Sequence, residues 1–238
     1  GLGGGMKAKT LQVRWHGTEP VFSLDFNPAS GLLATAGADR EIKLWEVGTG
    51  EDGSACVTHV ETLAGHKKAV NAVRFSPGGE LLCSAGCVGE VILWQPTSGE
   101  AKAGLKLPRL EWKMRPGGVL RGHTDDVQDV SWSADGRALI TGSVDNYCIL
   151  WSVAQGKPVL RLEGHRGYVQ GVGWDPLGEF VVSQSGDRTV RVFGPRGVPS
   201  NKDKATGAKG PQPLERWVKD LTCAAVLDKY ELGGAQPG

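Results

Sequence analysis

His, a hydroxyl residue and Asp return at regular distances from an aromatic residue in four stretches of this chain. A Ser or Thr stands ten positions before the aromatic residue in all four stretches, and an Asp stands six positions before it in three. The sets are His16, Thr35, Asp39 and Trp45; His66, Ser84 and Trp94; His123, Thr141, Asp145 and Trp151; and His165, Ser183, Asp187 and Phe193. Because His, Asp and a hydroxyl are also the groups of a nucleophilic triad, catalysis has to be weighed first.

The rest of the sequence argues against a catalytic site. It contains no Ser on a nucleophile elbow, no phosphate-binding loop behind a strand and no cluster with metal-ligand spacing. The five Cys residues match no zinc pattern. A dyad such as His123 and Asp145 can act in catalysis, but fourfold repetition favours buried polar groups that satisfy one another. We therefore expect a non-enzymatic protein with no cofactor and no metal site.

Each set is carried by the same succession of short strands. An alternating apolar strand follows the His, a turn rich in Gly, Pro or Asp comes next, and a strand of small residues contains the hydroxyl. Apolar residues at every second position, bounded by turn residues, are typical of tight β-meanders. A repeat of about 40–50 residues with Gly-His and Trp near its ends is the WD40 signature. The sequence thus predicts an all-β fold, a partial WD40 β-propeller with four recognisable blades.

The repeats also predict the organisation of the chain. We expect a flexible N-terminus at 1–8, a strand at 9–15 that closes the last blade of the ring, and blades at 16–60, 61–119, 120–162 and 163–193. Outer loops at 48–54 and 97–118 account for the uneven repeat lengths, and the second is either a docking loop or a solvated surface loop. A linker follows at 194–213. The divergent tail at 214–238 has apolar spacing that predicts a helix at 214–231.

The His, hydroxyl, Asp and Trp of one repeat are expected to form a hydrogen-bonded tetrad that fixes the turns of its blade. The predicted members are His123, Thr141, Asp145 and Trp151; His165, Ser183 and Asp187; and His66, Ser84 and Trp94. Only the third repeat is expected to be complete. Val88 replaces Asp in the second, Phe193 replaces Trp in the fourth, and His16 lies one residue further from its strand in the first.

The residues after each His, and those that open each inner strand, are expected on the narrow top face around the channel. The candidates for partner binding are Lys68, Asn71, Asp126, Gln128, Tyr168 and Gln170. Each is also compatible with an ordinary solvated loop tip. Tyr168 is the preferred anchor because aromatic residues dominate binding hot spots.

Charge and composition narrow the classes of partner. The chain has 238 residues and a formal net charge of +1, so no strong field attracts it to nucleic acid or to a membrane. No apolar run approaches the roughly 20 residues of a membrane span. We expect no membrane association and no direct sequence-specific DNA binding. Cys83, Cys87 and Cys148 fall at or beside strands, where a reduced Cys acts as a small hydrophobe, which indicates the cytosol or the nucleus.

Several segments resemble the middle, WD40 subunit of chromatin assembly factor 1. The most specific are Trp15-His16 with Glu19-Pro20-Val21, and Tyr168-Val169-Gln170 with Trp174-Asp175-Pro176. His66-Lys67-Lys68, Leu120-Arg121-Gly122-His123 and Ser143-Val144-Asp145-Asn146 add to the resemblance, which covers about residues 6–193. The histone regulator A family shares the Ser143–Asn146 segment and part of the Trp174–Gly178 segment, and is the runner-up.

This resemblance implies a nuclear, non-enzymatic scaffold in a histone chaperone complex. Such a complex deposits histones H3–H4 on DNA during replication- or repair-coupled nucleosome assembly. The implied partners are the large subunit of chromatin assembly factor 1 and histones H3–H4, bound directly or through the complex. The short basic motif that engages the anti-silencing histone chaperone in that family is absent, and four repeats stand where the family has about seven. The alternatives are a replication-independent chaperone subunit of the histone regulator A type and a generic WD40 adaptor.

Overall fold

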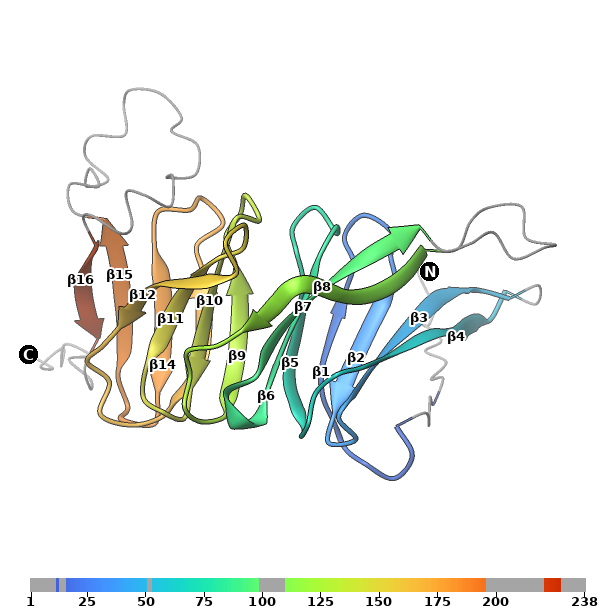
Figure 1. Ribbon diagram of the computed structural model, residues 1–238, viewed down its shortest axis with the longest axis horizontal. Coiled ribbons are helices and arrows are strands. Elements are labelled where there is room, and N and C mark those ends of the chain that lie inside the picture. The colour runs from blue at the N-terminus through green and yellow to red at the C-terminus, as the bar shows by residue number, and fades with distance from the viewer. Residues whose placement is uncertain (1–11, 13–15, 51–52, 99–109, 196–220, 228–238) are drawn as a thin grey trace, which may run out of the picture.

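The computed structural model describes residues 12, 16–50, 53–98, 110–195 and 221–227, which form four antiparallel sheets of four strands (Figure 1). The first sheet contains β1 (Val21–Phe26), β2 (Leu33–Gly37), β3 (Glu41–Thr49) and β4 (Ala55–Ala64). The second contains β5 (Val70–Phe75), β6 (Leu82–Gly86), β7 (Val91–Ser98) and β8 (Leu110–Leu120). The third contains β9 (Val127–Trp132), β10 (Ala138–Ser143), β11 (Cys148–Ser152) and β12 (Lys157–Leu162). The fourth contains β13 (Val169–Trp174), β14 (Val181–Ser185), β15 (Val190–Pro195) and β16 (Leu221–Leu227).

Each sheet is an up-and-down meander, and the four stand side by side in chain order (Figure 1). The one helical turn among the described residues is η1 (Cys87–Gly89). No helix within the described ranges has the length and apolar character needed to cross a membrane. The prediction of an all-β, partial WD40 propeller is therefore confirmed, and each sheet is one blade.

The blades share one register from the inner strand to the closing aromatic residue. A Val opens each inner strand, and the aromatic residue stands 24 positions later in every blade. The tight turns between the first two strands keep this spacing because Gly79, Gly136 and Gly178 take equivalent left-handed positions, with φ of 80°, 69° and 71°. A glycine adopts such a φ without steric cost. Equivalent positions in different blades can therefore be compared directly.

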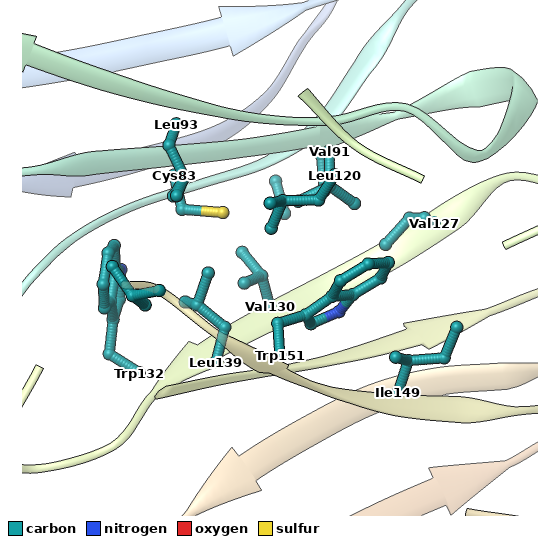
Figure 2. Packing of buried hydrophobic residues seen from close by; sticks show 13 residues of the cluster. Cys83, Val91, Leu93, Leu120, Val127, Val130, Trp132, Leu139, Ile149 and Trp151 are labelled. Carbon is teal, nitrogen blue, oxygen red and sulfur yellow. The ribbon is translucent and has the colours of Figure 1, made fainter. Parts of the chain in front are cut away.

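The hydrophobic cores lie between neighbouring blades. Between blades two and three, Cys83, Val91 and Leu93 pack against Leu139 and Trp151, all with 0% exposure (Figure 2). A similar core joins blades one and two, and another joins blades three and four. Burying one such Leu side chain stabilises the fold by about 1.5–3 kcal/mol. Blade-to-blade contact is thus the main source of stability.

Side chains of one inner strand also bind the backbone of the next. Ser23 Oγ and Asp25 Oδ2 of β1 accept hydrogen bonds from the N–H groups of Val73 and Phe75, at 3.1 and 2.7 Å. The border between blades three and four repeats this arrangement, with Asp129 and Ser131 accepting from Val172 and Trp174. These bonds satisfy N–H groups that face away from the neighbouring strand of their own sheet.

The expected borders of blades one and two are corrected. β4 continues to Ala64, so residues 61–64 belong to blade one rather than blade two, and β8 ends blade two at Leu120 rather than at 119. Much of the expected outer loop 97–118 belongs to the strand β8. Within it the Trp112 side chain is only 6% exposed and packs edge-on against Phe75, with ring centroids 5.6 Å apart. Trp112 therefore belongs to the core and not to a docking loop.

The expected helix at 214–231 is wrong for residues 221–227, which form β16. This strand pairs antiparallel with β15 and extends blade four beyond its expected end at 193. Pairing with a sheet edge overrides a weak local helical pattern because strand preference depends strongly on context. The expected segment 1–8, the strand at 9–15 except Gln12, and most of the linker at 194–213 lie outside the described residues.

Candidate functional site

The four predicted tetrad members of blade three meet around the hydroxyl of Thr141. His123 places Nε2 2.7 Å from Thr141 Oγ1 and Nδ1 2.8 Å from Asp145 Oδ2. The indole Nε1–H of Trp151 donates to the same Thr141 oxygen at 2.8 Å. With the His123 Nδ1–H donating to the carboxylate, the Thr141 hydroxyl can donate to Nε2 and accept from the indole. Every polar group is then satisfied.

This connectivity is also that of a nucleophilic triad, but the hydroxyl is inaccessible. Thr141 is 0% exposed, and its counterparts Ser84 and Ser183 are 0% and 1% exposed. The Trp151 indole occupies one side of the Thr141 oxygen. A substrate carbonyl has no approach to an oxygen enclosed in this way, so the geometry supports a structural role for the tetrads.

Blade one contains a second complete tetrad. Its members His16, Thr35, Asp39 and Trp45 are joined by contacts of 2.7–2.8 Å. The extra residue between His16 and β1 is accommodated by a turn in which Gly17 has φ +62° and Glu19 N–H donates to His16 O at 3.1 Å. The expectation that blade three alone would be complete is therefore wrong, because a local turn compensates for the altered spacing.

Blade four has three members. His165 places Nε2 2.7 Å from Ser183 Oγ and Nδ1 2.9 Å from Asp187 Oδ2. Phe193 fills the place of the Trp with 3% exposure and supplies no N–H donor. The hydroxyl of Ser183 thus lacks the indole contact that the other three blades have.

The Asp residues connect the tetrads to the top face. Burial alone would raise the pKa of Asp145 and of Asp187, but hydrogen bonds from the His ring and from backbone N–H groups hold both pKa values below the usual range. The backbone donors include Thr124 N, 3.0 Å from Asp145, and Arg166 N, 2.9 Å from Asp187. Each carboxylate therefore fixes the loop that follows the His of its own blade.

In blade two Val88 stands where the other blades have Asp, and Glu90 Oε2 accepts from the N–H of Lys67 at 3.0 Å instead. His66 Nε2 still lies 2.7 Å from Ser84 Oγ, and Trp94 Nε1 donates to that oxygen at 2.8 Å. The buried His66 Nδ1 has no hydrogen-bond partner, and the nearest carboxylate oxygen, Glu90 Oε2, is 3.5 Å away. Burial lowers the pKa of His66 to about 4, although Glu90 partly offsets this effect.

The turn around Val88 is also strained. Val88 has φ +58°, an uncommon conformation for a β-branched residue. Its side chain is 49% exposed on the top face, and its N–H donates to Asp126 Oδ1 of blade three at 2.8 Å. The repeat pattern marks this position only as a missing Asp. An apolar residue at a turn position otherwise occupied by Asp was the signal that could have marked it as exposed.

The structure brings three of the six candidate contact residues together at the border of blades two and three. Lys68, Asn71 and Asp126 surround Cys87, whose pKa is raised by burial and by Asp126. Asn71 Nδ2 donates to Val127 O at 2.9 Å, so Asn71 and Asp126 both bridge the two blades. A structural role therefore accounts for these two residues.

The other candidates are more accessible. Lys68 is exposed and Gln128 is half-buried. Tyr168 and Gln170 are exposed on blade four, with 48% exposure for Tyr168. The Tyr168 ring lies against the backbone of Gly186, where an added Cβ would come within 2.9 Å of it. Lys68, Tyr168 and Gln170 are thus available to a partner in the described structure.

The arrangement of blades and tetrads can be compared with known proteins. A family described as the CAF1B/HIR1 beta-propeller domain matches residues 6–216. The chain belongs to this family. The CAF1B/HIR1 match covers all four blades except the last strand, β16.

Curated CAF1B/HIR1 relatives extend the comparison. The chain is 41% identical over 203 residues to "Chromatin assembly factor 1 subunit FAS2 homolog" of Oryza sativa, covering 84% of this chain and 38% of the relative. It is 40% identical over 200 residues to a chromatin assembly factor 1 subunit of Gallus gallus, covering 79% of this chain and 35% of the relative. "Protein HIR1" of Mycosarcoma maydis is 33% identical over 182 residues, covering 73% of this chain and 18% of the relative. The chain spans little more than a third of these two chromatin assembly factor relatives.

Proposed function

We propose that this chain is a non-enzymatic, nuclear scaffold subunit of a histone chaperone complex. The complex deposits histones H3–H4 on DNA during replication- or repair-coupled nucleosome assembly. The observation that carries the proposal is the 41% identity to a chromatin assembly factor 1 subunit over 84% of the chain. The buried hydroxyls of Ser84, Thr141 and Ser183 and the loops that Asp145 and Asp187 fix agree with a rigid binding platform.

The proposed partners are the large subunit of chromatin assembly factor 1 and histones H3–H4, bound directly or through the complex. The top face offers Tyr168 as an anchor, with Lys68 and Gln170 as polar contacts. Aromatic side chains bury a large area at little conformational cost, so one exposed Tyr can dominate such an interface. The match to HIR1 supports a replication-independent chaperone subunit as the second candidate.

Reconstituted capture tests the proposal. Tagged large subunit should retain the purified chain together with H3–H4, and Tyr168→Ala should reduce retention about tenfold or more. The control is Leu177→Ala, since Leu177 is 61% exposed but lies in the turn before β14 rather than in the loop that follows His165. If Tyr168→Ala is retained as well as Leu177→Ala, Tyr168 is not an anchor for the partner. Failure of the unmodified chain to bind the large subunit would refute the first candidate function.

A template comparison separates the two candidates. Supplementation of a depleted extract with the chain should restore nucleosome assembly on replicating DNA more than on non-replicating DNA. Restoration on both templates alike would instead favour the replication-independent function.

A further inference from the structure

The turn between β6 and β7 differs from the equivalent turn of the other blades. Asp39, Asp145 and Asp187 occupy this turn in blades one, three and four, and each side chain is at most 15% exposed, with a carboxylate oxygen within 2.9 Å of a His nitrogen. Blade two has η1 (Cys87–Gly89) instead, in which Val88 has φ +58° and is 49% exposed. The same position is therefore turned inward in three blades and outward in blade two.

Glu90 makes the backbone contact that the Asp residues make elsewhere. Its Oε2 accepts from the Lys67 N–H at 3.0 Å, as Asp145 accepts from the Thr124 N–H in blade three. The loop after the His of blade two is thus held without any contribution from Val88. A left-handed conformation is unfavourable for a β-branched residue, and such conformations cluster at functional sites. The exposed Val88 side chain is therefore available for a role outside the fold.

Two lysines lie on the blade-two side of Val88. The Lys67 side chain is 77% exposed, and its Nζ lies 3.9 Å from Oε1 of Glu90, whose side chain is 15% exposed. Lys68 is exposed as well. Burial and Asp126 raise the pKa of the neighbouring Cys87 thiol, and Lys68 partly offsets this effect, which places the Lys68 ammonium group near the turn. Two cations on this side thus face one carboxylate.

Two aspartates lie on the blade-three side. Asp126 Oδ1 accepts from the Val88 N–H at 2.8 Å across the blade border. Asp125 is exposed, and its Oδ1 accepts from the Asp126 N–H at 2.7 Å. The charge of the top face therefore changes sign across Val88. Blades two and three are flanked on both sides by described blades, so the exposure of this border does not depend on the open sides of blades one and four.

We propose that Lys67, Lys68, Val88 and Asp125, here called the Val88 patch, bind a partner segment with an apolar side chain between an acidic and a basic group. The apolar side chain covers Val88, the acidic group faces the two lysines, and the basic group faces Asp125. This inference rests on the proposed function, and it assigns the segment to the large subunit of the chaperone complex. A uniformly basic histone tail is disfavoured, because two lysines would repel it.

The Val88 patch gives direction more than affinity. Exposed charges at an interface mainly set orientation and association rate, and a segment bound in the reverse direction would bring like charges together. The apolar contact at Val88 is small, so it accounts for only part of the binding. Val88→Ala removes two methyl groups that are about half exposed, which corresponds to roughly fourfold weaker binding.

Binding of the purified chain to tagged large subunit tests the proposal. Val88→Ala should weaken the binding about fourfold, and Val88→Asp at least about tenfold, because a charge then enters the apolar contact. Leu177→Asp is the control, since it places the same charge on a 61% exposed residue in the turn between β13 and β14, at the opposite end of its blade. This variant should bind like the unmodified chain.

Thermal unfolding of the same variants separates binding from folding. The carboxylate of Val88→Asp can give the buried His66 Nδ1 the acceptor that His123 has in Asp145, so this variant should be at least as stable as the unmodified chain. Weaker binding at an undiminished Tm marks a residue retained for function at the expense of stability. If both Val88 variants bind as tightly as the unmodified chain, the proposal is overturned while the proposed function stands. Failure of the unmodified chain to bind the large subunit overturns both.

Charge reversal tests the lysines. The double variant Lys67→Glu, Lys68→Glu should weaken binding about tenfold at low salt and by less at about 0.5 M salt, which screens exposed charges. The matched control is Arg137→Glu, Lys157→Glu, in which both residues are exposed beside turns at the opposite end of blade three. Equal weakening by the two double variants, or tighter binding of the Lys67 and Lys68 variant, would contradict an acidic group facing the two lysines.

Discussion

Val88→Asp is expected to stabilise the protein by completing the tetrad of blade two. His66 Nδ1 is buried without a hydrogen-bond partner, whereas the equivalent nitrogens of His16, His123 and His165 lie 2.7–2.9 Å from a carboxylate. An Asp in place of Val88 takes the sequence position of Asp39, Asp145 and Asp187, none of which has a positive φ, and it supplies the missing acceptor when the turn adopts their conformation. It also removes a β-branched side chain from a left-handed backbone position.

The magnitude follows from opposing contributions. A hydrogen bond to a charged group contributes about 1.5–3 kcal/mol, and relief of the left-handed strain adds up to about 1–2 kcal/mol. The new carboxylate comes near Glu90 and Asp126, and a changed turn gives up the bond from Val88 N to Asp126. We expect a net gain of about 1–2 kcal/mol, which corresponds to a rise in Tm of about 3–6 °C for a domain of this size.

Urea and thermal unfolding at pH 7 measure the gain, with Val88→Ala as the matched control. The Ala variant removes the β-branch but adds no acceptor, so the difference between the two variants isolates the contact with His66. An NMR titration should also show the pKa of His66 raised above its unmodified value of about 4. Equal stability of the Asp and Ala variants, together with an unchanged His66 titration, would refute the reasoning.

Two further predictions concern the tetrads. Asp145→Ala should lower the free energy of unfolding by about 1–3 kcal/mol in urea titrations, because the buried His123 Nδ1 loses its acceptor; an unchanged midpoint would contradict this. The pKa of His66 is about 4 in the folded state against 6.5 in the unfolded state, so the unfolded state binds its proton first. Stability should therefore fall as the pH decreases from about 6.5 to about 4, by up to ~3 kcal/mol, and this loss should be smaller in His66→Gln.

The repeat determined most of what the sequence could predict. A hydroxyl, an Asp and an aromatic residue at fixed distances located the second to fourth tetrads and the strands around them, because the distances reflect one meander used four times. The tetrad of blade one was missed because spacing alone does not show that Gly17 can take a left-handed turn. The left-handed turn at Gly17 allows the contacts of His16 that its altered spacing had led us to exclude.

The outer strands were harder to predict, because the residues that they pair with or pack against are distant in the sequence. β16 reads locally as part of an amphipathic helix, and only the edge of β15 makes it a strand. β8 lies in an insertion whose Trp112 finds its place against Phe75 of an inner strand. The sequence also did not predict that Leu24 and Phe26 are exposed, because they have the same apolar pattern as their buried equivalents Val73 and Phe75.

Two buried thiols make the opening of the blades measurable one border at a time. Cys83 lies in the core between blades two and three, and Cys148 in the core between blades three and four. Burial raises the pKa of both thiols, that of Cys148 to about 12, so neither supplies reactive thiolate while its core is closed. Cys56 is exposed and provides an internal reference for the alkylating reagent. The labelling rates of Cys83 and Cys148, measured relative to Cys56, would therefore show which of the two blade borders separates first.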